Sequence, residues 1–111
     1  MEIFESRAND VVILTPKGRV DASNAASLEA HVIALIDAGE RRLVLELKDL
    51  DYVSSAGLRV MLVTAKRLGA AGGKLALASP QPAVREILDI AGLSTILQIL
   101  PNARAATEAV R

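Results

Sequence analysis

An apolar strand leads into a helix within the run Leu50-Asp51-Tyr52-Val53-Ser54-Ser55-Ala56-Gly57-Leu58-Arg59-Val60-Met61-Leu62, which decides the fold. Two hydroxyls, those of Ser54 and Ser55, stand where the strand ends and the helix begins. A serine at a helix start can accept a hydrogen bond from a first-turn N–H that lacks an intrahelical partner. The same N–H groups and the positive end of the helix dipole also favour a phosphate there. Helix-start chemistry alone favours the cap and leaves phosphorylation open.

Strand-like and helix-like patterns alternate along the rest of the chain. A hairpin is expected from the apolar runs 3–6 and 11–15, which flank Asn9-Asp10, and Pro16 is expected to disturb the second strand before Val20. Alternating or continuous apolar residues predict further strands at 43–48, 74–79 and 96–100. Apolar residues at helical spacing, and alanine content in the last case, predict helices at 23–38, 55–70, 84–91 and 103–110. This order predicts an α/β class and one domain over residues 1–111, with a mixed sheet of four to five strands and about four helices.

The composition limits the classes of function. The 111 residues are 51% hydrophobic, and 13 basic residues balance 13 acidic ones, so no broad cationic field for nucleic acid is expected. Phe4 and Tyr52 are the only aromatic residues, which removes the usual stacking platform for single strands. The chain has no cysteine, no secretory signal and no apolar run of membrane-spanning length. We therefore expect a cytoplasmic protein that neither inserts into a membrane nor binds nucleic acid directly.

Known catalytic arrangements are missing. The single histidine, His31, lies in the middle of the first predicted helix beside its apolar stripe, where a boundary or surface role is expected. No dinucleotide fingerprint, phosphate-binding loop, or zinc or calcium ligand spacing is found. The glycine-rich segment 69–73 follows a helix instead of opening one, which is typical of a helix-to-strand connection. The sequence therefore predicts neither an enzyme nor a cofactor or metal site.

Asp21 and Arg59 each have a local and a functional interpretation. Asp21 ends the phrase Gly18-Arg19-Val20-Asp21 just before the first predicted helix, where a carboxylate can bond turn amides or face a partner. Arg59 follows Ser55 by four residues, so both can share one helical face. There Arg59 either contacts a phosphate or a partner's carboxylate, or is simply solvated.

These motifs resemble a known family. The phrase Gly18-x-x-Asp21, then a helix, then an apolar strand leading into Tyr52-Val53-Ser54-Ser55-Ala56-Gly57-Leu58 resembles the bacterial STAS domain of anti-sigma factor antagonists. The resemblance extends over nearly the whole chain and implies a single STAS domain. Its strongest motif is Ser-x-Gly-Leu at the start of the second helix.

The resemblance implies a partner switch. In such systems the unmodified antagonist binds an anti-sigma factor that is also a serine kinase, which frees the sigma factor. Phosphorylation by that kinase disrupts binding, and a separate phosphatase restores it. Alignment on Gly57 and Leu58 places the phospho-acceptor at Ser55. The expected partner-binding residues are Gly18, Asp21, Ser23, Asn24, Ser54, Ala56, Gly57 and Arg59.

Two alternatives stay open. Ser54 stands where many family members have an aspartate, which makes it the second candidate for the acceptor. STAS-like domains also serve as subunits that bind the ATPase of phospholipid-transport ABC systems, where the same helix face would act without a phosphorylation cycle. In either case we expect a monomer that meets its partners through this face.

Overall fold

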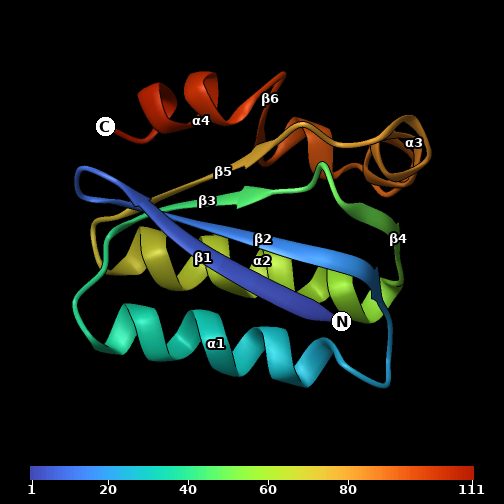
Figure 1. Cartoon of the computed structure of the whole chain (residues 1–111), viewed down its shortest axis with the longest axis horizontal. Coiled ribbons are helices and arrows are strands. Elements are labelled where there is room, and N and C mark those ends of the chain that lie inside the picture. The colour runs from blue at the N-terminus through green and yellow to red at the C-terminus, as the bar shows by residue number, and fades with distance from the viewer.

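A mixed sheet forms the centre of the protein in the computed structural model, which describes all 111 residues (Figure 1). Strands β1 (Glu2–Ala8) and β2 (Val11–Val20) form an antiparallel hairpin. The remaining pairs are parallel, in the order β1-β2-β3-β5-β6, with β3 at Arg42–Glu46, β5 at Lys74–Ala78 and β6 at Gln98–Leu100. A sixth strand, β4 (Leu50–Val53), pairs with the far end of β2.

Two long helices cover one face of the sheet and one short helix covers the other (Figure 1). Helices α1 (Ala25–Asp37) and α2 (Ser55–Ala70) pack against each other and against the sheet around a core of 21 buried residues. Helix α4 (Ala103–Ala109) packs on β3, β5 and β6 over a second, smaller apolar cluster. Helix α3 (Pro82–Ile90) lies beside β4 and is followed by a short 3₁₀ turn at Leu93–Thr95. No helix is both long enough and apolar enough to cross a membrane.

The α/β class, the mixed sheet and the four helices are confirmed. The sheet has six strands instead of four to five, because the chain turns at 48–49, where the N–H of Leu50 donates to the carbonyl of Leu47, and then pairs again as β4. The irregularity expected before Val20 lies between Gly18 and Arg19, and Pro16 itself stays paired within β2. Gly18 has φ +98°, a conformation that glycine adopts without strain.

The strand directions place two connections at one end of the molecule. Strands β2 and β4 run parallel, so their carboxyl ends, which lead into α1 and α2, lie side by side. Figure 1 shows both connections at the end of the sheet opposite the α1-to-β3 connection. The motifs around Asp21 and Ser55 therefore meet, although 34 positions separate them in the sequence.

Candidate functional site

The site is built on the junction between β2 and the start of α2. Val20 pairs with Val53 in parallel register, and the backbone N–H of Ser54 donates to the carbonyl of Val20 at 2.9 Å. This bond fixes the first residues of α2 against the end of β2. The structure thereby brings the two sequence motifs into one surface.

The two serines at the start of α2 have different surroundings. Ser54 is the N-cap, and its Oγ accepts a hydrogen bond from the N–H of Gly57 at 3.4 Å. Ser55 is the first residue of the helix, is exposed, and makes no side-chain hydrogen bond within the chain. Ser54 therefore caps the helix, whereas the exposed hydroxyl of Ser55 has no bond within the chain.

Gly57 holds α2 close to the sheet. It is buried, and a Cβ built on it would lie 2.6 Å from Cγ2 of Val53 and 2.8 Å from Cγ1 of Val20. Both distances are far below ordinary van der Waals contact, so only glycine permits this approach. Gly57 was expected on the partner-facing surface, but it lies beneath that surface and positions Ser54 and Ser55.

Hydrogen bonds within the β2–α1 loop fix the residues around Asp21. The carboxylate of Asp21 accepts from the hydroxyl of Ser23 at 2.5 Å and from its backbone N–H at 2.9 Å. These bonds, with a smaller contribution from the charge of Arg19, hold the pKa of Asp21 below its usual value. Asn24 accepts from the N–H of Asp21 and donates to the carbonyl of Arg19, both at 2.9 Å. Asp21 therefore presents a charged group on a loop of fixed shape.

Helix α1 begins two residues later than predicted. Ser23 belongs to the loop, and Asn24 occupies the N-cap position before Ala25. The side chain of Asn24 bonds the loop instead of the first turn of the helix, because both of its polar atoms are already engaged.

Arg59 has a partner on another element. Its guanidinium pairs with Glu29 of α1 at 3.1 Å, and its side chain is 69% exposed. The pair links the exposed sides of α1 and α2, so Arg59 contributes a tethered positive charge near the site. Ala56, between the two serines and Gly57, is half-buried against the core.

Sequence reasoning missed one pair at this surface. The guanidinium of Arg19 lies 4.5 Å from the centroid of the Tyr52 ring, and the two residues are opposite each other in the β2–β4 register. Both side chains are exposed. Exposed arginine and tyrosine are residues typical of protein interfaces. The signal available was Tyr52 itself, one of only two aromatic residues and the first residue of the motif.

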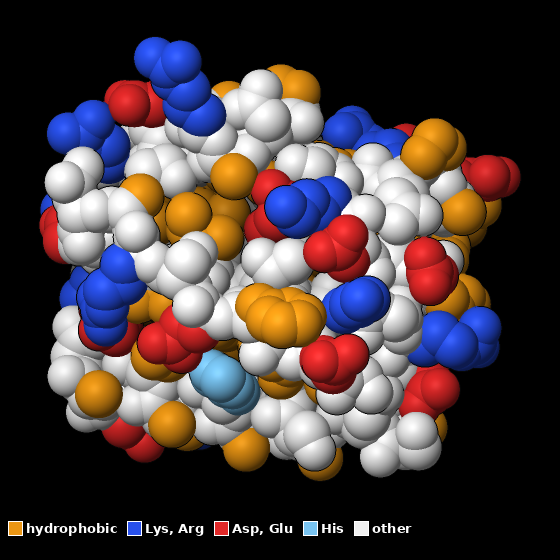
Figure 2. All heavy atoms as spheres, in the orientation of Figure 1, with side chains coloured by type: hydrophobic (Ala, Val, Ile, Leu, Met, Phe, Trp, Pro, Cys, Tyr) orange, Lys and Arg blue, Asp and Glu red, His pale blue; other side chains and the backbone are white.

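The surroundings of the site suit a protein partner better than a small ligand. The one cavity of the molecule lies elsewhere, and no cluster of acidic or histidine side chains could hold a metal ion. Figure 2 shows acidic and basic side chains interspersed on the face that it displays, with no broad field of one sign. An exposed surface without a pocket can be recognised by another protein, and its free hydroxyl can accept a phosphate.

Comparisons with known proteins agree with this geometry. The family model of the STAS domain matches residues 5–106. The anti-sigma factor antagonist BtrV of Bordetella bronchiseptica is 40% identical over 111 residues, which cover 100% of this chain and 96% of BtrV. An anti-sigma factor antagonist of Thermotoga maritima is 31% identical over 104 residues, which cover 93% of this chain and 92% of that protein.

Two solved structures have the same fold as this chain. The crystal structure of an anti-sigma factor antagonist from Thermotoga maritima superposes with a TM-score of 0.93 at 29% identity, over 98% of this chain and 94% of that one. The fold is also that of SpoIIAA of Bacillus in its phosphorylated form, with a TM-score of 0.75 at 20% identity, over 99% of this chain and 100% of that one. The match of the family model over most of the chain, with the identity to BtrV, shows that this protein belongs to the STAS domain family.

Proposed function

We propose that this protein is an anti-sigma factor antagonist whose surface around Ser55 binds an anti-sigma factor with serine kinase activity. Binding frees the sigma factor. Phosphorylation of Ser55 by that kinase ends the binding, and a phosphatase acting on the phosphorylated form restores it. The names of the relatives support the antagonist role.

The observation that carries the phosphorylation step is the free hydroxyl of Ser55. It is exposed and without a hydrogen bond in the chain, whereas Ser54 beside it already caps the helix. A kinase needs an accessible hydroxyl, and only Ser55 provides one without giving up a bond in the fold. This difference supports Ser55 as the acceptor and makes Ser54 the second choice.

The same position allows release without unfolding. A phosphate adds roughly −1.5 to −2 charges, so a surface that receives a neutral hydroxyl would experience repulsion and desolvation. At the first residue of α2, however, the phosphate lies near the positive end of the helix dipole, which favours it. The modification therefore acts on the interface while the core beneath it stays intact.

The neighbouring residues extend the interface in this proposal. Asp21, Ser23 and Asn24 form the fixed loop beside the start of α2, and Gly18 supplies the bulge that precedes it. The exposed pair of Arg19 and Tyr52 lies on the adjoining strands. A partner that contacts Ser55 would meet this loop as well, which supports one continuous docking surface.

Affinity capture from native lysate with four baits tests the proposal: wild type, Ser55→Ala, Ser55→Asp and Ser6→Asp. Ser6 is an exposed serine of β1, so Ser6→Asp adds the same charge away from α2. We expect wild type, Ser55→Ala and Ser6→Asp to recover a serine-kinase anti-sigma factor, and Ser55→Asp to recover at least tenfold less of it. Mass spectrometry should find phosphate on Ser55 of the wild-type protein. Circular dichroism should show that Ser55→Asp stays folded.

Two results would contradict the proposal. Phosphate on Ser54 with Ser55 unmodified would reassign the acceptor. Equal recovery of a transporter ATPase by all four baits would instead identify a constitutive subunit of an ABC system, with no phosphorylation cycle.

A further inference from the structure

The one cavity of the molecule lies at the end of the sheet opposite Ser55. Its volume is about 280 Å³, and it is lined by Arg41, Arg42, Gly72, Gly73, Lys74, Val110 and Arg111. Four of these seven residues are cationic, none is acidic, and one is hydrophobic. In a chain with a net charge of zero, this is a local concentration of positive charge.

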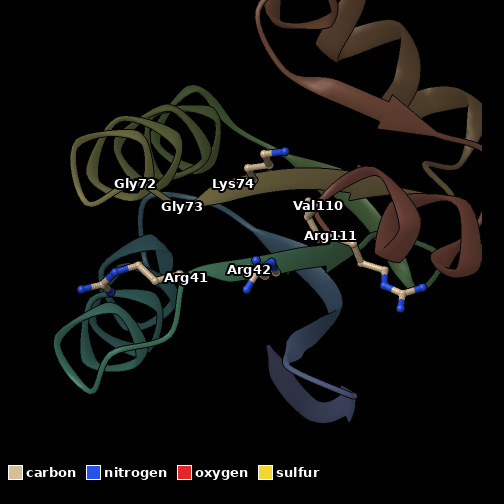
Figure 3. Close-up of a pocket in the computed structure, with 7 residues that line it drawn as sticks. All are labelled: Arg41, Arg42, Gly72, Gly73, Lys74, Val110 and Arg111. Atoms are coloured by element: carbon tan, nitrogen blue, oxygen red, sulfur yellow. The ribbon is translucent and has the colours of Figure 1, made fainter.

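Three segments far apart in the sequence supply these cations (Figure 3). Arg42 and Lys74 are the first residues of the neighbouring strands β3 and β5 and are opposite each other in parallel register. They therefore point to the same face of the sheet, the face that α4 covers. Arg111 follows α4 and lies on the other side of the cavity, as Figure 3 shows.

The register places like charges next to each other. Neighbouring strands are about 4.8 Å apart, and like charges at opposed positions destabilise a sheet. Asp10 of the hairpin pairs with Arg42 at 2.7 Å and Glu108 pairs with Arg111 at 3.2 Å, but both acids lie outside the lining. Lys74 has no ion-pair partner in the chain and is exposed. Lys74 therefore lacks a counter-charge in the chain, which a bound anion would supply.

The backbone is closely packed at Gly73, and the N–H groups of Gly73 and Lys74 are already engaged within the chain. A Cβ on Gly73 would lie 2.3 Å from the carbonyl oxygen of Arg41, so this position admits only glycine. The N–H of Gly73 donates to Leu68 and that of Lys74 donates to Arg41. Arg41 also donates to the carbonyls of Ile36 and Glu40 through Nη1, which leaves its other N–H groups free. Side-chain cations must therefore do the binding.

We propose that this cavity binds a small polyanion of the diphosphate class. Two phosphate groups can bridge Lys74 and the guanidinium groups of Arg42 and Arg111, since arginine forks match phosphate oxygens and the ammonium group acts as a point charge. The volume is at the lower limit for ligand pockets, and Val110 alone offers apolar surface. A free diphosphate therefore fits better than a nucleotide, whose base would find nothing to pack against. The site is independent of the partner surface at Ser55.

Titration of the ¹⁵N-labelled 111-residue chain with inorganic diphosphate tests the proposal, at an ionic strength held constant with sodium chloride. The expected result is saturable chemical-shift change at Gly72, Gly73, Lys74 and Val110 and none at Ser55. Lys74→Gln should weaken the binding at least fivefold. Lys66→Gln removes the same charge from an exposed position of α2 outside the cavity and should change it less than twofold.

Three results would overturn the proposal. The first is the absence of saturable shifts up to 10 mM diphosphate, and the second is equal weakening by Lys74→Gln and Lys66→Gln, which would indicate general ionic attraction. The third concerns the source of the diphosphate group: ADP binding more than tenfold tighter than free diphosphate would show recognition of the nucleoside and refute the small-anion assignment.

Discussion

Replacement of Gly57 by alanine tests how closely α2 must approach the sheet. Alanine is about 1 kcal/mol more favourable than glycine in a helix, so propensity alone predicts stabilisation. The added Cβ, however, would lie 2.6 Å from Val53 and 2.8 Å from Val20, both fully buried. The stiff χ1 of valine prevents either side chain from turning away. Overpacking of this kind costs about 1–3 kcal/mol, which the propensity gain of about 1 kcal/mol partly offsets, so we expect Gly57→Ala to lower the free energy of unfolding by up to about 2 kcal/mol.

Urea denaturation followed by circular dichroism measures this change, and α2 supplies its own control. Gly69 is in the same helix, and a Cβ added there would have nothing within 4 Å, so Gly69→Ala should raise stability by up to about 1 kcal/mol. Val53→Ala removes the nearest clashing group, so the double variant Gly57→Ala/Val53→Ala should be more stable than the sum of the single changes by about 0.5–3 kcal/mol. Gly57→Ala as stable as Gly69→Ala, or additive with Val53→Ala, would refute the close-approach argument.

Two further predictions concern the loop and the cap. Ser54→Ala removes the bond to the N–H of Gly57 and should destabilise the fold by about 0.5–1 kcal/mol. Ser55→Ala should keep the free energy of unfolding within about 0.5 kcal/mol of wild type. Urea denaturation of both variants shows which serine caps α2, and equal losses of stability would contradict the assignment to Ser54. Because the folded pKa of Asp21 is depressed, its contribution to stability is complete above the unfolded value of about 3.9 and is lost as pH falls through the lower folded value. The difference in free energy of unfolding between wild type and Asp21→Asn should therefore shrink below about pH 4. A difference in urea midpoint that is constant from pH 2 to 7 would show that the bonds from Ser23 do not lower the pKa of the Asp21 carboxylate.

Periodicity predicted most of the fold, because the long apolar patterns of α1, α2 and β3 depend only on which face is buried. A strand was expected to lead into α2, but the turn at 48–49 that separates β4 from β3 was not predicted, since β4 is defined by its pairing with the end of β2 and not by an alternation of its own. The helix predicted at 23–38 includes Ser23 because apolar residues at helical spacing do not define the residue at which a helix begins. In the folded chain Ser23 instead donates to Asp21, a local bond that competes with capping.

Contacts between distant segments could not be predicted from the sequence, because they depend on how the helices and strands pack. The sequence singled out Arg59 by its spacing from Ser55, but only the packing of α1 on α2 brings Glu29 to it. Likewise, Gly57 was recognised from a motif without a physical reason, which the side chains of Val20 and Val53 now supply. Arg42 and Lys74 became neighbours only through the parallel register of β3 and β5.

The division of roles between Ser54 and Ser55 bears on how such a surface could be modified reversibly. A phosphate on Ser54 would act on the residue that caps α2, directly above the contact of Gly57 with the sheet, so modification and folding would be coupled. A phosphate on Ser55 replaces no bond of the fold and changes only the charge and shape of the exposed surface. Release of a partner then costs the domain little stability, and a phosphatase can reach the group without local unfolding. This physical difference between two adjacent serines, invisible in the sequence, is the strongest structural argument for Ser55 as the acceptor.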